Sequence, residues 1–348
     1  MIPAQSYAAF DSVSPLRPYP LERREPGPTD VAINIQYCGI CHTDLHFVKN
    51  DLGLTRYPLV PGHEITGTVD RVGSEVTRFK LGDPVAVGCM VNSCRTCASC
   101  QQGEEQYCPR CILTYSWVDR DGSTTQGGYS TKVTVDEHFV LRMPEGLPMD
   151  AAAPLLCAGI TTYSPLRTWG VGAGARLAVV GLGGLGHMTV KLGAAMGAEV
   201  TVISTSERKK DDALGMGAKR FLISRDKEAM EASAFGFDLI INTVSSAHEI
   251  NDLLNLLAKD GTMVLLGVAT EPIPVPSLPL LFGRRRLAGS LIGGIAQTQE
   301  MLDFCAERGI TADVEVIRAD QINEAYARLG RGDVRYRFVI DMASMAAA

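Results

Sequence analysis

Residues 36–46, QYCGICHTDLH, bring two cysteines, two histidines, a threonine and an aspartate into one short stretch. Side chains of these types bind metal ions or move protons, and thiolate and imidazole together are ligands that zinc prefers. Three interpretations are open. The stretch is a redox-active cysteine pair, half of a zinc finger, or part of an active site that residues elsewhere in the chain complete.

A second group of cysteines lies in CRTCASCQQGEEQYC, which supplies Cys94, Cys97, Cys100 and Cys108. Four thiolates at this spacing can surround one tetrahedral zinc ion and leave no open position, as structural sites do. An iron–sulfur cluster is the competing interpretation, but the last spacing does not fit the usual ferredoxin pattern. Cys111 could replace Cys108 as the fourth ligand. We predict a structural zinc lobe at residues 94–111, where the metal folds a loop with little core of its own.

Residues that could complete the first stretch lie in PGHE, which supplies His63 and Glu64, and in LLCAG, which supplies Cys157. Cys41, His63 and Cys157 would leave a fourth position for water or substrate, which is the pattern of a catalytic zinc site. Sequence spacing alone cannot show that residues from such distant segments bind the same metal ion. A buried histidine beside small core cysteines therefore remains an alternative.

A glycine-rich turn, GLGGLG, provides Gly181, Gly183 and Gly186 at the G-x-G-x-x-G spacing. The spacing alone also fits a packing turn. Here the turn follows the apolar strand RLAVV and begins a helix, which is the context of a dinucleotide-binding turn. Glycines let backbone N–H groups approach a pyrophosphate, whose charge the helix N-terminus favours. We predict that this turn binds a dinucleotide.

The end of the next strand, VISTSERKK, indicates which dinucleotide. NAD-specific sites place an acidic residue there to bind the ribose 2′-hydroxyl. Ser204 occupies that position here, and hydroxyl and cationic side chains follow it: Thr205, Ser206, Arg208, Lys209 and Lys210. Such groups can bind a 2′-phosphate that a carboxylate would repel. NADP(H) is favoured over a simply solvated basic helix start.

The secondary-structure elements that must position the candidate metal and cofactor residues follow two different patterns in two parts of the chain. Up to about residue 155, short β-branched strands alternate apolar and polar residues between glycine and proline turns, which indicates a barrel-like β unit. Strands then alternate with helices, which predicts a parallel, doubly wound sheet. FDLIINTVS, GTMVLLGV and RRLAGSLIG read as further buried strands, and INDLLNLLAKD reads as a helix. From about residue 292 a helix, strand, helix and strand follow, and we expect this tail to return to the first unit.

The length, charge and composition of the chain limit the classes of function that it can have. A chain of 348 residues is long for one core, so two domains are expected. The net charge is -6, and the densest cationic cluster, GRRRL at 283–287, is a weak signal for nucleic acid. No apolar run is long enough to span a bilayer, and the N-terminus lacks the pattern of a signal peptide. We expect a cytoplasmic protein whose ten cysteines are thiols or metal ligands rather than disulfides.

The chain resembles the zinc-dependent medium-chain alcohol dehydrogenases, in particular the cinnamyl alcohol dehydrogenase group. It looks closest to microbial NADPH-dependent aldehyde reductases of broad specificity. The motifs that carry the resemblance occur in order along nearly the whole chain: CGICHTDLH, PGHEITG, LGDPVAVG, the four-cysteine lobe, TQGGYS, PLLCAGITTYSPL, VVGLGGLGHMTVKL, GSLIGG, TQEMLDFCAERGI, ADQINEAY and RYRFVID.

The resemblance implies the fold and its division. It implies a GroES-like β-barrel catalytic domain at 1–156, an NADP-binding Rossmann domain at 157–291 and a C-terminal segment at 292–348 that returns to the catalytic domain. It also implies two zinc ions per chain, one catalytic and one structural, and a homodimer paired through the nucleotide domain. Neither nucleic acid nor membrane is expected as a partner.

The resemblance also implies individual roles at the catalytic centre. Cys41, His63 and Cys157 match the catalytic-zinc ligands, and Glu64 matches an acid that can enter the zinc shell. Asp44 would orient a ligand. Thr43 and His46 match the groups that relay the proton. Cys38 has no implied role. The residues that the resemblance assigns to the cofactor are His42, Thr161, Gly181, Leu182, Gly183, Gly184, Leu185, Gly186, Ser204, Thr205, Ser206, Lys209, Val268 and Ser290.

The implied reaction is reversible hydride transfer between NADPH and an aldehyde, with zinc polarising the carbonyl oxygen. Leu113 stands where lignin-pathway enzymes carry a pocket tryptophan, so we expect aromatic and medium-length aliphatic aldehydes to be accepted. A dedicated cinnamyl alcohol dehydrogenase is the alternative. An NAD-dependent polyol or secondary-alcohol dehydrogenase is disfavoured by Ser204 and by cysteine rather than glutamate at 157. A cofactor-binding protein without catalytic zinc is disfavoured by the complete ligand set.

Overall fold

The computed structural model describes residues 1–246, 248–269 and 271–347. The chain divides into two compact units. Unit 1 contains residues 1–160 together with the chain from residue 293 onward, and unit 2 contains residues 161–292. The helix α4 (Ala158–Thr168) begins in unit 1 and continues into unit 2. Unit 2 is therefore an insertion in the sequence of unit 1.

Unit 1 is built on a seven-stranded sheet in the order β16-β17-β3-β4-β5-β9, with β8 also paired to β3. Its pairs are antiparallel except for β16 and β17. Two smaller sheets, β1-β2 and β6-β7, complete the unit. The strands are β1 (Ile2–Ala8), β2 (Arg17–Arg23), β3 (Asp30–Ile40), β4 (Ile65–Val72), β5 (Pro84–Val87), β6 (Met90–Asn92), β7 (Ile112–Leu113), β8 (Lys132–Asp136), β9 (Leu141–Arg142), β16 (Val314–Arg318) and β17 (Arg337–Asp341).

Apart from α10, which has 14 residues, the helices of unit 1 are short. They are α1 (His42–Lys49), α2 (Ala98–Gln101), α3 (Met149–Ala152), α10 (Ile295–Arg308) and α11 (Ile322–Gly330), with 3-10 turns η1 (Glu105–Tyr107), η2 (Glu137–Phe139), η3 (Ala153–Leu156), η5 (Ala319–Gln321) and η6 (Met342–Ala347).

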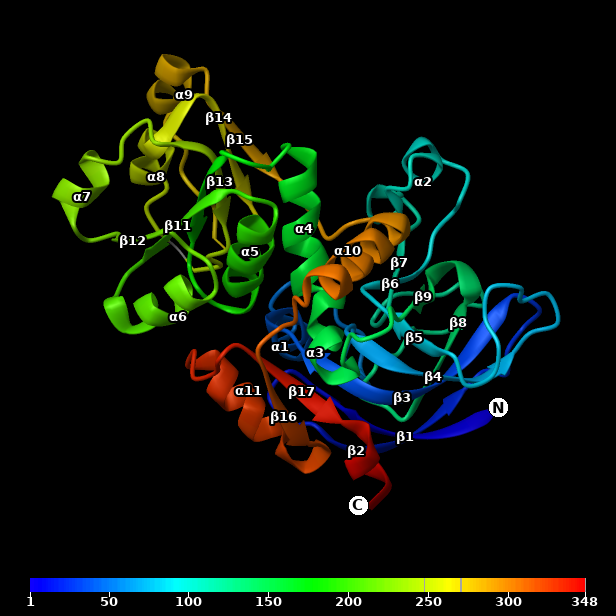
Figure 1. The fold of residues 1–348 in the computed structure, drawn as a ribbon. Helices are drawn as coiled ribbons and strands as arrows, with labels where there is room; N and C mark the ends of the chain where they lie inside the picture. The colour runs from blue at the N-terminus through cyan, green and yellow to red at the C-terminus, as the bar shows by residue number, and fades with distance from the viewer. Residues whose placement is uncertain (247, 270, 348) are drawn as a thin grey trace. The chain divides into compact units, whose positions relative to one another are not determined.

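The C-terminal strand occupies the interior of this sheet rather than its edge. β17 pairs with β3, so Phe338 lies opposite Ile40 and Ile340 lies opposite Cys38. Figure 1 shows this as the red strand β17 beside the blue strand β3. Phe338 and Ile340 are buried because the strand is covered on both edges and packs into the core. The last strand of the chain thus reaches the segment that carries the first cysteine and histidine motif.

Unit 2 is a six-stranded parallel sheet in the order β12-β11-β10-β13-β14-β15, and the predicted doubly wound parallel sheet is confirmed. Strand order reverses at β10, where such folds place their ligands. The strands are β10 (Arg176–Val180), β11 (Glu199–Ser204), β12 (Arg220–Ile223), β13 (Phe237–Asn242), β14 (Leu257–Leu265) and β15 (Arg286–Gly289). The helices are α5 (Gly184–Ala195), η4 (Glu207–Lys209), α6 (Lys210–Gly215), α7 (Lys227–Glu231), α8 (Asn251–Leu256) and α9 (Ser277–Gly283).

Two local expectations in unit 2 were wrong. The stretch 285–293 was predicted as a buried strand, but β15 is the last strand of the sheet, and Leu287 and Ala288 are only half-buried. The predicted helix at 250–260 ends at Leu256, because β14 begins at Leu257. The apolar run LLNLL does not distinguish a helix from a strand, and pairing with β13 decides its second half.

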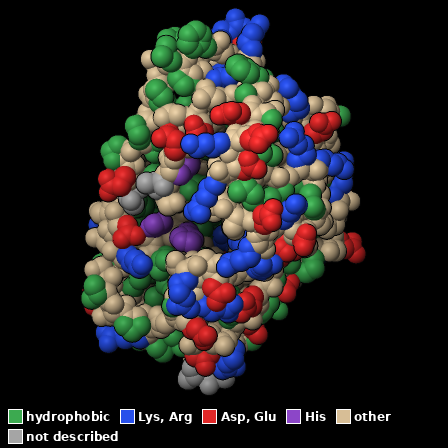
Figure 2. All heavy atoms as spheres, turned by 90° about the vertical axis from the view of Figure 1, so that its left-hand side faces the viewer, with side chains coloured by type: hydrophobic (Ala, Val, Ile, Leu, Met, Phe, Trp, Pro, Cys, Tyr) green, Lys and Arg blue, Asp and Glu red, His purple; other side chains and the backbone are tan. Residues whose placement is uncertain are grey.

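The arginine cluster at 283–287 has structural partners. Arg284 forms an ion pair with Asp260, and Arg285 donates to the backbone carbonyl oxygen of Leu257 at 2.8 Å. On the face drawn in Figure 2, Lys and Arg side chains are interspersed with Asp and Glu. The buried Arg285 therefore links the sheet edge to β14, whereas the ion pair of Arg284 lies at the surface. In the part of the chain that the structure describes, no helix has both the length and the apolar character needed to cross a membrane.

Candidate active site and metal centres

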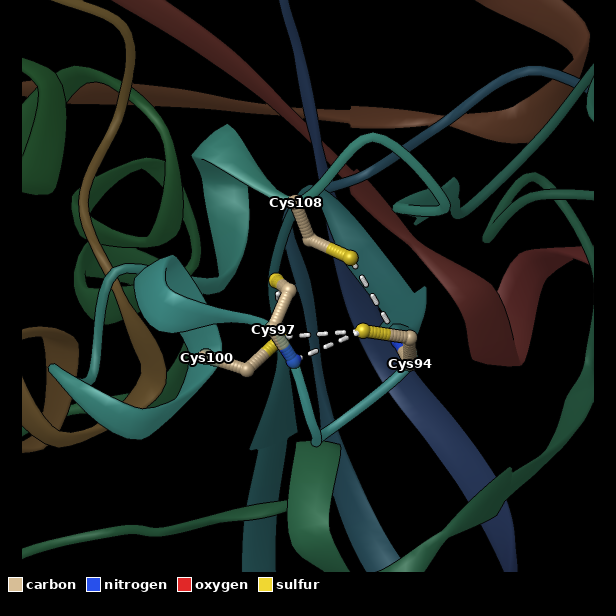
Figure 3. Close-up of side chains that lie close together, drawn as sticks. All are labelled: Cys94, Cys97, Cys100 and Cys108. Carbon is tan, nitrogen blue, oxygen red and sulfur yellow. Dashed lines mark hydrogen bonds between the residues drawn. The ribbon is translucent and has the colours of Figure 1, made fainter.

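The four-cysteine lobe brings its thiols together at one point. The sulfur atoms of Cys94, Cys97, Cys100 and Cys108 all lie within 4.8 Å of one another. Cys94 Sγ is 3.9 Å from Cys100 Sγ, and Cys97 Sγ is 3.6 Å from Cys100 Sγ. Figure 3 shows all four side chains turned inward. These separations are close to the distance between two sulfur ligands of a tetrahedral zinc–thiolate site, about 3.8 Å.

Backbone N–H groups stabilise the thiolate form in this lobe. The amides of Thr96 and Cys97 donate to Cys94 Sγ and lower the pKa of that thiol to about 5. Cys111 lies to one side, with its sulfur 3.7 Å from Met90 Sδ, and burial raises its pKa to about 12. Of the two candidates for the fourth ligand, the structure places Cys108 in the cluster.

A buried carboxylate connects the lobe to the C-terminal segment. Glu105, in η1, accepts a hydrogen bond from the Ile295 amide at the first turn of α10 at 3.1 Å. Its other oxygen lies 3.1 Å from His138 Nε2. Gly294 permits this approach, because a Cβ atom there would collide with the backbone oxygen of Gly103. The lobe is thus fixed against the start of α10.

A second metal-binding group forms from segments far apart in the sequence. Ligand atoms of Cys41, His63, Glu64 and Cys157 all lie within 4.8 Å of one another, and all four residues are buried. Cys41 Sγ is 3.8 Å from Cys157 Sγ. Cys41 follows β3, the histidine and the glutamate precede β4, and Cys157 follows η3. The pairing of β3 with β4 explains why the first two segments meet.

Asp44 organises this group through a carboxylate that is fully buried. Its Oδ2 atom accepts the Cys41 amide at 2.8 Å and so caps α1. Its Oδ1 atom accepts the Gly62 amide at 3.1 Å and lies 3.1 Å from His63 Nδ1. Because a carboxylate requires a proton on Nδ1, the Nε2 lone pair of His63 is left for a metal.

Two tyrosines extend this network. Tyr129 donates its hydroxyl to Asp44 Oδ2 at 3.3 Å, and Tyr326 donates to the Tyr129 hydroxyl at 3.4 Å. Burial, together with the charge of Asp44, raises the pKa of both phenols well above their ordinary value. Both hydroxyls therefore remain protonated and act as donors.

Glu64 has a buried cationic partner. Its Oε1 atom forms an ion pair with Arg337 at the start of β17, and both side chains are buried. Its Oε2 atom has no hydrogen-bond partner among the described residues. Burial raises the pKa of Glu64 to about 7, although the charge of Arg337 opposes that rise. One oxygen is therefore held by arginine while the other remains available to a cation.

Helix α1 carries the remaining polar groups of this motif. Thr43 Oγ1 lies 3.5 Å from Cys41 Sγ, at the edge of the metal group. His46 is one turn further along, and its Nδ1 atom lies 2.8 Å from Asp51 Oδ2. His42 is the exposed first residue of the helix. The helix thus orders a hydroxyl near the metal group and an imidazole towards solvent.

The glycine turn of unit 2 shows a separate role for each glycine. Gly181 has φ of 86°, which favours glycine. A Cβ at Gly183 would meet no atom within 4 Å, so the backbone is open to a ligand. A Cβ at Gly186 would lie 2.1 Å from the Gly181 oxygen, which only glycine avoids. These are the three roles that a pyrophosphate-binding turn requires.

A cavity of about 820 Å³ opens beside this turn. It is lined by the turn and by the end of β11, including Ser204, Thr205, Ser206, Arg208 and Lys209. The ammonium group of this lysine donates to the backbone oxygen of Leu182 at 2.8 Å. Glu249 and Asp252 also line the cavity, from the segment after β13. At the end of β11, where NAD-specific sites carry an acid, the cavity is instead lined by hydroxyl and cationic side chains.

The other predicted cofactor contacts lie outside this cavity. Gly184 and Leu185 form the first turn of α5. Thr161 is buried in α4, Val268 is exposed after β14, and Ser290 follows β15. The last two follow the carboxyl ends of adjacent parallel strands, the edge where ligands of such sheets bind.

The fold and the two cysteine-containing groups define a class of protein. Residues 27–145 match the alcohol dehydrogenase GroES-like domain, and residues 184–307 match the zinc-binding dehydrogenase family. The chain belongs to the zinc-dependent medium-chain alcohol dehydrogenases and is an oxidoreductase. The predicted fold class, a GroES-like domain with a Rossmann-type sheet, is confirmed.

Relatives of this chain include NADP-dependent alcohol dehydrogenase C from Mycobacterium bovis, 56% identical over 341 residues that cover 98% of this chain and 99% of that protein. The structure is similar to a cinnamyl alcohol dehydrogenase from Sorghum bicolor, with a TM-score of 0.96, 51% identity and 98% of each chain covered. It is also similar to CAD from Helicobacter pylori complexed with NADP(H), with a TM-score of 0.92, 41% identity and coverage of 98% and 99%.

Both groups fit zinc by their own chemistry. Thiolate sulfur and imidazole nitrogen are the donors that zinc prefers, and each group offers four ligand atoms close enough for one ion. Asp44 fixes the imidazole in the tautomer that a metal requires. The all-cysteine group has no place for a further ligand. The buried group contains a carboxylate that can yield its position, so it suits catalysis.

Three residues that surround the buried metal-binding group were missed by the sequence interpretation. Arg337, Tyr129 and Tyr326 are buried around Glu64 and Asp44. A sequence signal existed for the arginine, because RFVID places a cation directly before the apolar run 338–340. Nothing local marks either tyrosine as a neighbour of Asp44.

Proposed function

We propose that the protein is a zinc- and NADP(H)-dependent alcohol dehydrogenase and aldehyde reductase that transfers hydride reversibly between NADPH and an aldehyde. The observation that carries this proposal is the buried group formed by Cys41, His63 and Cys157, with Glu64 beside it. Three strong ligands with one exchangeable carboxylate suit a metal that must admit substrate oxygen. The family membership and the NADP dependence named for the Mycobacterium relative support it.

A zinc ion held there would act as a Lewis acid on the substrate oxygen, while NADPH supplies or NADP accepts the hydride. The residues of the chain hold the metal and move the proton. We propose that Thr43, which lies beside Cys41, exchanges a proton with the substrate oxygen. His46, half-buried and paired with Asp51, would pass that proton to or from solvent.

The cofactor preference is supported by the cavity beside the glycine turn. Ser204 ends β11 where NAD-specific sites have an acid, and Arg208 and Lys209 line the same cavity. Their charges suit a 2′-phosphate, and Gly183 leaves room for a pyrophosphate. Thr161, Val268 and Ser290 are proposed as further cofactor contacts.

We propose that the protein reduces aromatic and medium-length aliphatic aldehydes. Leu113, half-buried in β7, takes the place of a pocket tryptophan, so less aromatic surface is available for stacking against a phenylpropenyl ring. A panel of benzaldehyde, cinnamaldehydes and medium-chain aliphatic aldehydes tests this. An exclusive preference for hydroxycinnamaldehydes would support the cinnamyl alcohol dehydrogenase alternative instead.

We further propose a cytoplasmic homodimer paired through unit 2. The edge strand β15 has a free side for pairing, and α9 exposes Leu278, Leu281 and Phe282, which are 60%, 72% and 84% exposed. None of the ten cysteines forms a disulfide in the described residues, which agrees with a reducing compartment. Light scattering of the purified protein checks the dimer.

The cofactor proposal is tested by comparing NADPH with NADH in benzaldehyde reduction. Ser204→Asp should lower kcat/KM for NADPH about 10- to 1000-fold, because a carboxylate within about 4 Å would repel the 2′-phosphate. Ser246→Asp is the matched control, because it adds a carboxylate elsewhere in the same cavity and should leave the NADPH/NADH ratio near that of the wild type. Equal wild-type rates with NADH would contradict the proposal.

A further inference from the structure

The loop at residues 126–132 is fixed against the PGHE loop that carries His63. The Gly127 amide donates to the Val60 oxygen at 2.7 Å, and the Tyr129 amide donates to the Pro61 oxygen at 2.9 Å. The Gly128 amide donates to the Gly62 oxygen at 2.8 Å. Three backbone hydrogen bonds therefore hold the two loops together.

The side chain of Arg23 anchors this loop from the other side. Its guanidinium group donates to the backbone oxygens of Gln126, Gly127 and Lys132 and to the Ser130 hydroxyl, at 2.6 to 2.8 Å. All of these acceptors are uncharged, so the arginine serves the loop rather than an acidic partner. The position of Tyr129 within the loop is thereby determined.

The ring and hydroxyl of Tyr129 then contact the metal-binding segment. A Cβ at Gly62 would lie 2.5 Å from Tyr129 Cδ1, so the ring packs directly on the residue before His63. The hydroxyl donates to Asp44 Oδ2, the carboxylate that also holds His63 Nδ1. Tyr326, from α11, donates to that hydroxyl in turn.

We propose that Tyr129 is a positioning residue for the catalytic metal, which sets the place of His63 through Gly62 and the charge distribution of Asp44 through its hydroxyl. Tyr326 supports the Tyr129 hydroxyl from the C-terminal segment. Asp44 orients the imidazole of His63, and Tyr129 contacts both that carboxylate and the residue before the histidine. This inference rests on the zinc site of the proposed function.

The test measures metal binding by the full-length protein, loaded with zinc or cobalt, without reference to turnover. Tyr129→Phe removes only the hydroxyl, and Tyr326→Phe removes only the outer hydrogen bond. Tyr57→Phe is the matched control, because its hydroxyl donates to the Val48 oxygen of the same helix α1 and not to Asp44. Cys157→Ser identifies which zinc signal belongs to the catalytic site.

Competition with a chromogenic chelator should show catalytic-site zinc affinity about 3- to 10-fold weaker in Tyr129→Phe, less than the 10- to 100-fold typical of direct partners of ligands. The visible spectrum of the cobalt-loaded protein should also change. Tyr326→Phe should change both measurements less, in the same direction, and Tyr57→Phe should match the wild type.

Wild-type affinity and spectrum in Tyr129→Phe would overturn the inference, as would equal changes in all three variants. If Tyr129→Phe fails to fold, Tyr326→Phe decides the matter, and its agreement with Tyr57→Phe would overturn the inference. A wild-type protein that binds only the lobe zinc would instead refute the proposed function.

Discussion

Asp44→Asn should separate the structural and metal-binding roles of one carboxylate. Asp44 accepts the Cys41 and Gly62 amides, His63 Nδ1 and the Tyr129 hydroxyl, two donors on each oxygen. Asparagine has one acceptor oxygen, so either orientation of its amide leaves two buried donors facing an NH2 group. At about 1 to 3 kcal/mol for each unsatisfied donor, the free energy of unfolding should fall by about 2 to 6 kcal/mol.

Urea unfolding measures this loss, and zinc analysis of the same preparation should show catalytic-site affinity reduced about 10- to 100-fold. Asp51→Asn is the control for stability, because Asp51 also pairs with a histidine but is exposed to solvent. It should change the free energy of unfolding by less than about 1 kcal/mol. A stable Asp44→Asn protein that retains both zinc ions would refute the reasoning.

Three further predictions concern charges and ligands in unit 1. Arg337→Met should cost about 3 to 5 kcal/mol of unfolding free energy near pH 8, because it leaves Glu64 buried without its partner, and thermal and urea unfolding check this. Cys108→Ser should yield one zinc per chain by elemental analysis, whereas Cys111→Ser should retain two, and the reverse result would reassign the fourth ligand. Burial opposes ionisation of Glu105, but its hydrogen bonds from a histidine and a backbone amide hold its pKa below the ordinary value. The ionised carboxylate therefore stabilises the fold above pH about 4.5, and this contribution is lost as the pH falls further. Glu105→Gln should therefore show a shallower loss of stability below pH 4.5 than the wild type, and identical acid unfolding curves would contradict this assignment.

Local spacing predicted the sites that depend on neighbouring residues. Cys94, Cys97 and Cys100 lie within one loop, so their spacing alone indicated a common metal. The glycine turn was equally local, since Gly181 and Gly186 meet within a single strand-to-helix connection. In both places the residues are close in the sequence, so few relative positions are open to them and the spacing predicts that they meet.

Contacts between residues that strand pairing brings together could not be predicted from sequence spacing. Cys157 was linked to Cys41 only by resemblance, and the structure brings their sulfurs to 3.8 Å. Arg337 was read as part of a strand, because nothing in the sequence states that β17 pairs with β3 beside Glu64. The arginines at 284 and 285 gave only a weak signal for nucleic acid, and the structure shows an ion pair for the first and backbone acceptors for the second.

The placement of β17 within the sheet of unit 1 has a consequence for biosynthesis. Unit 2 is one continuous segment, so it can fold on the ribosome as soon as residue 292 has emerged. Unit 1 cannot complete its sheet until β17 is made, and until then the β3 edge is open and Glu64 lacks its arginine. The nascent chain therefore contains all four residues of the buried metal-binding group before the strand that completes their sheet is made. A truncation before residue 337 should destabilise that group and leave the sheet of unit 2 intact.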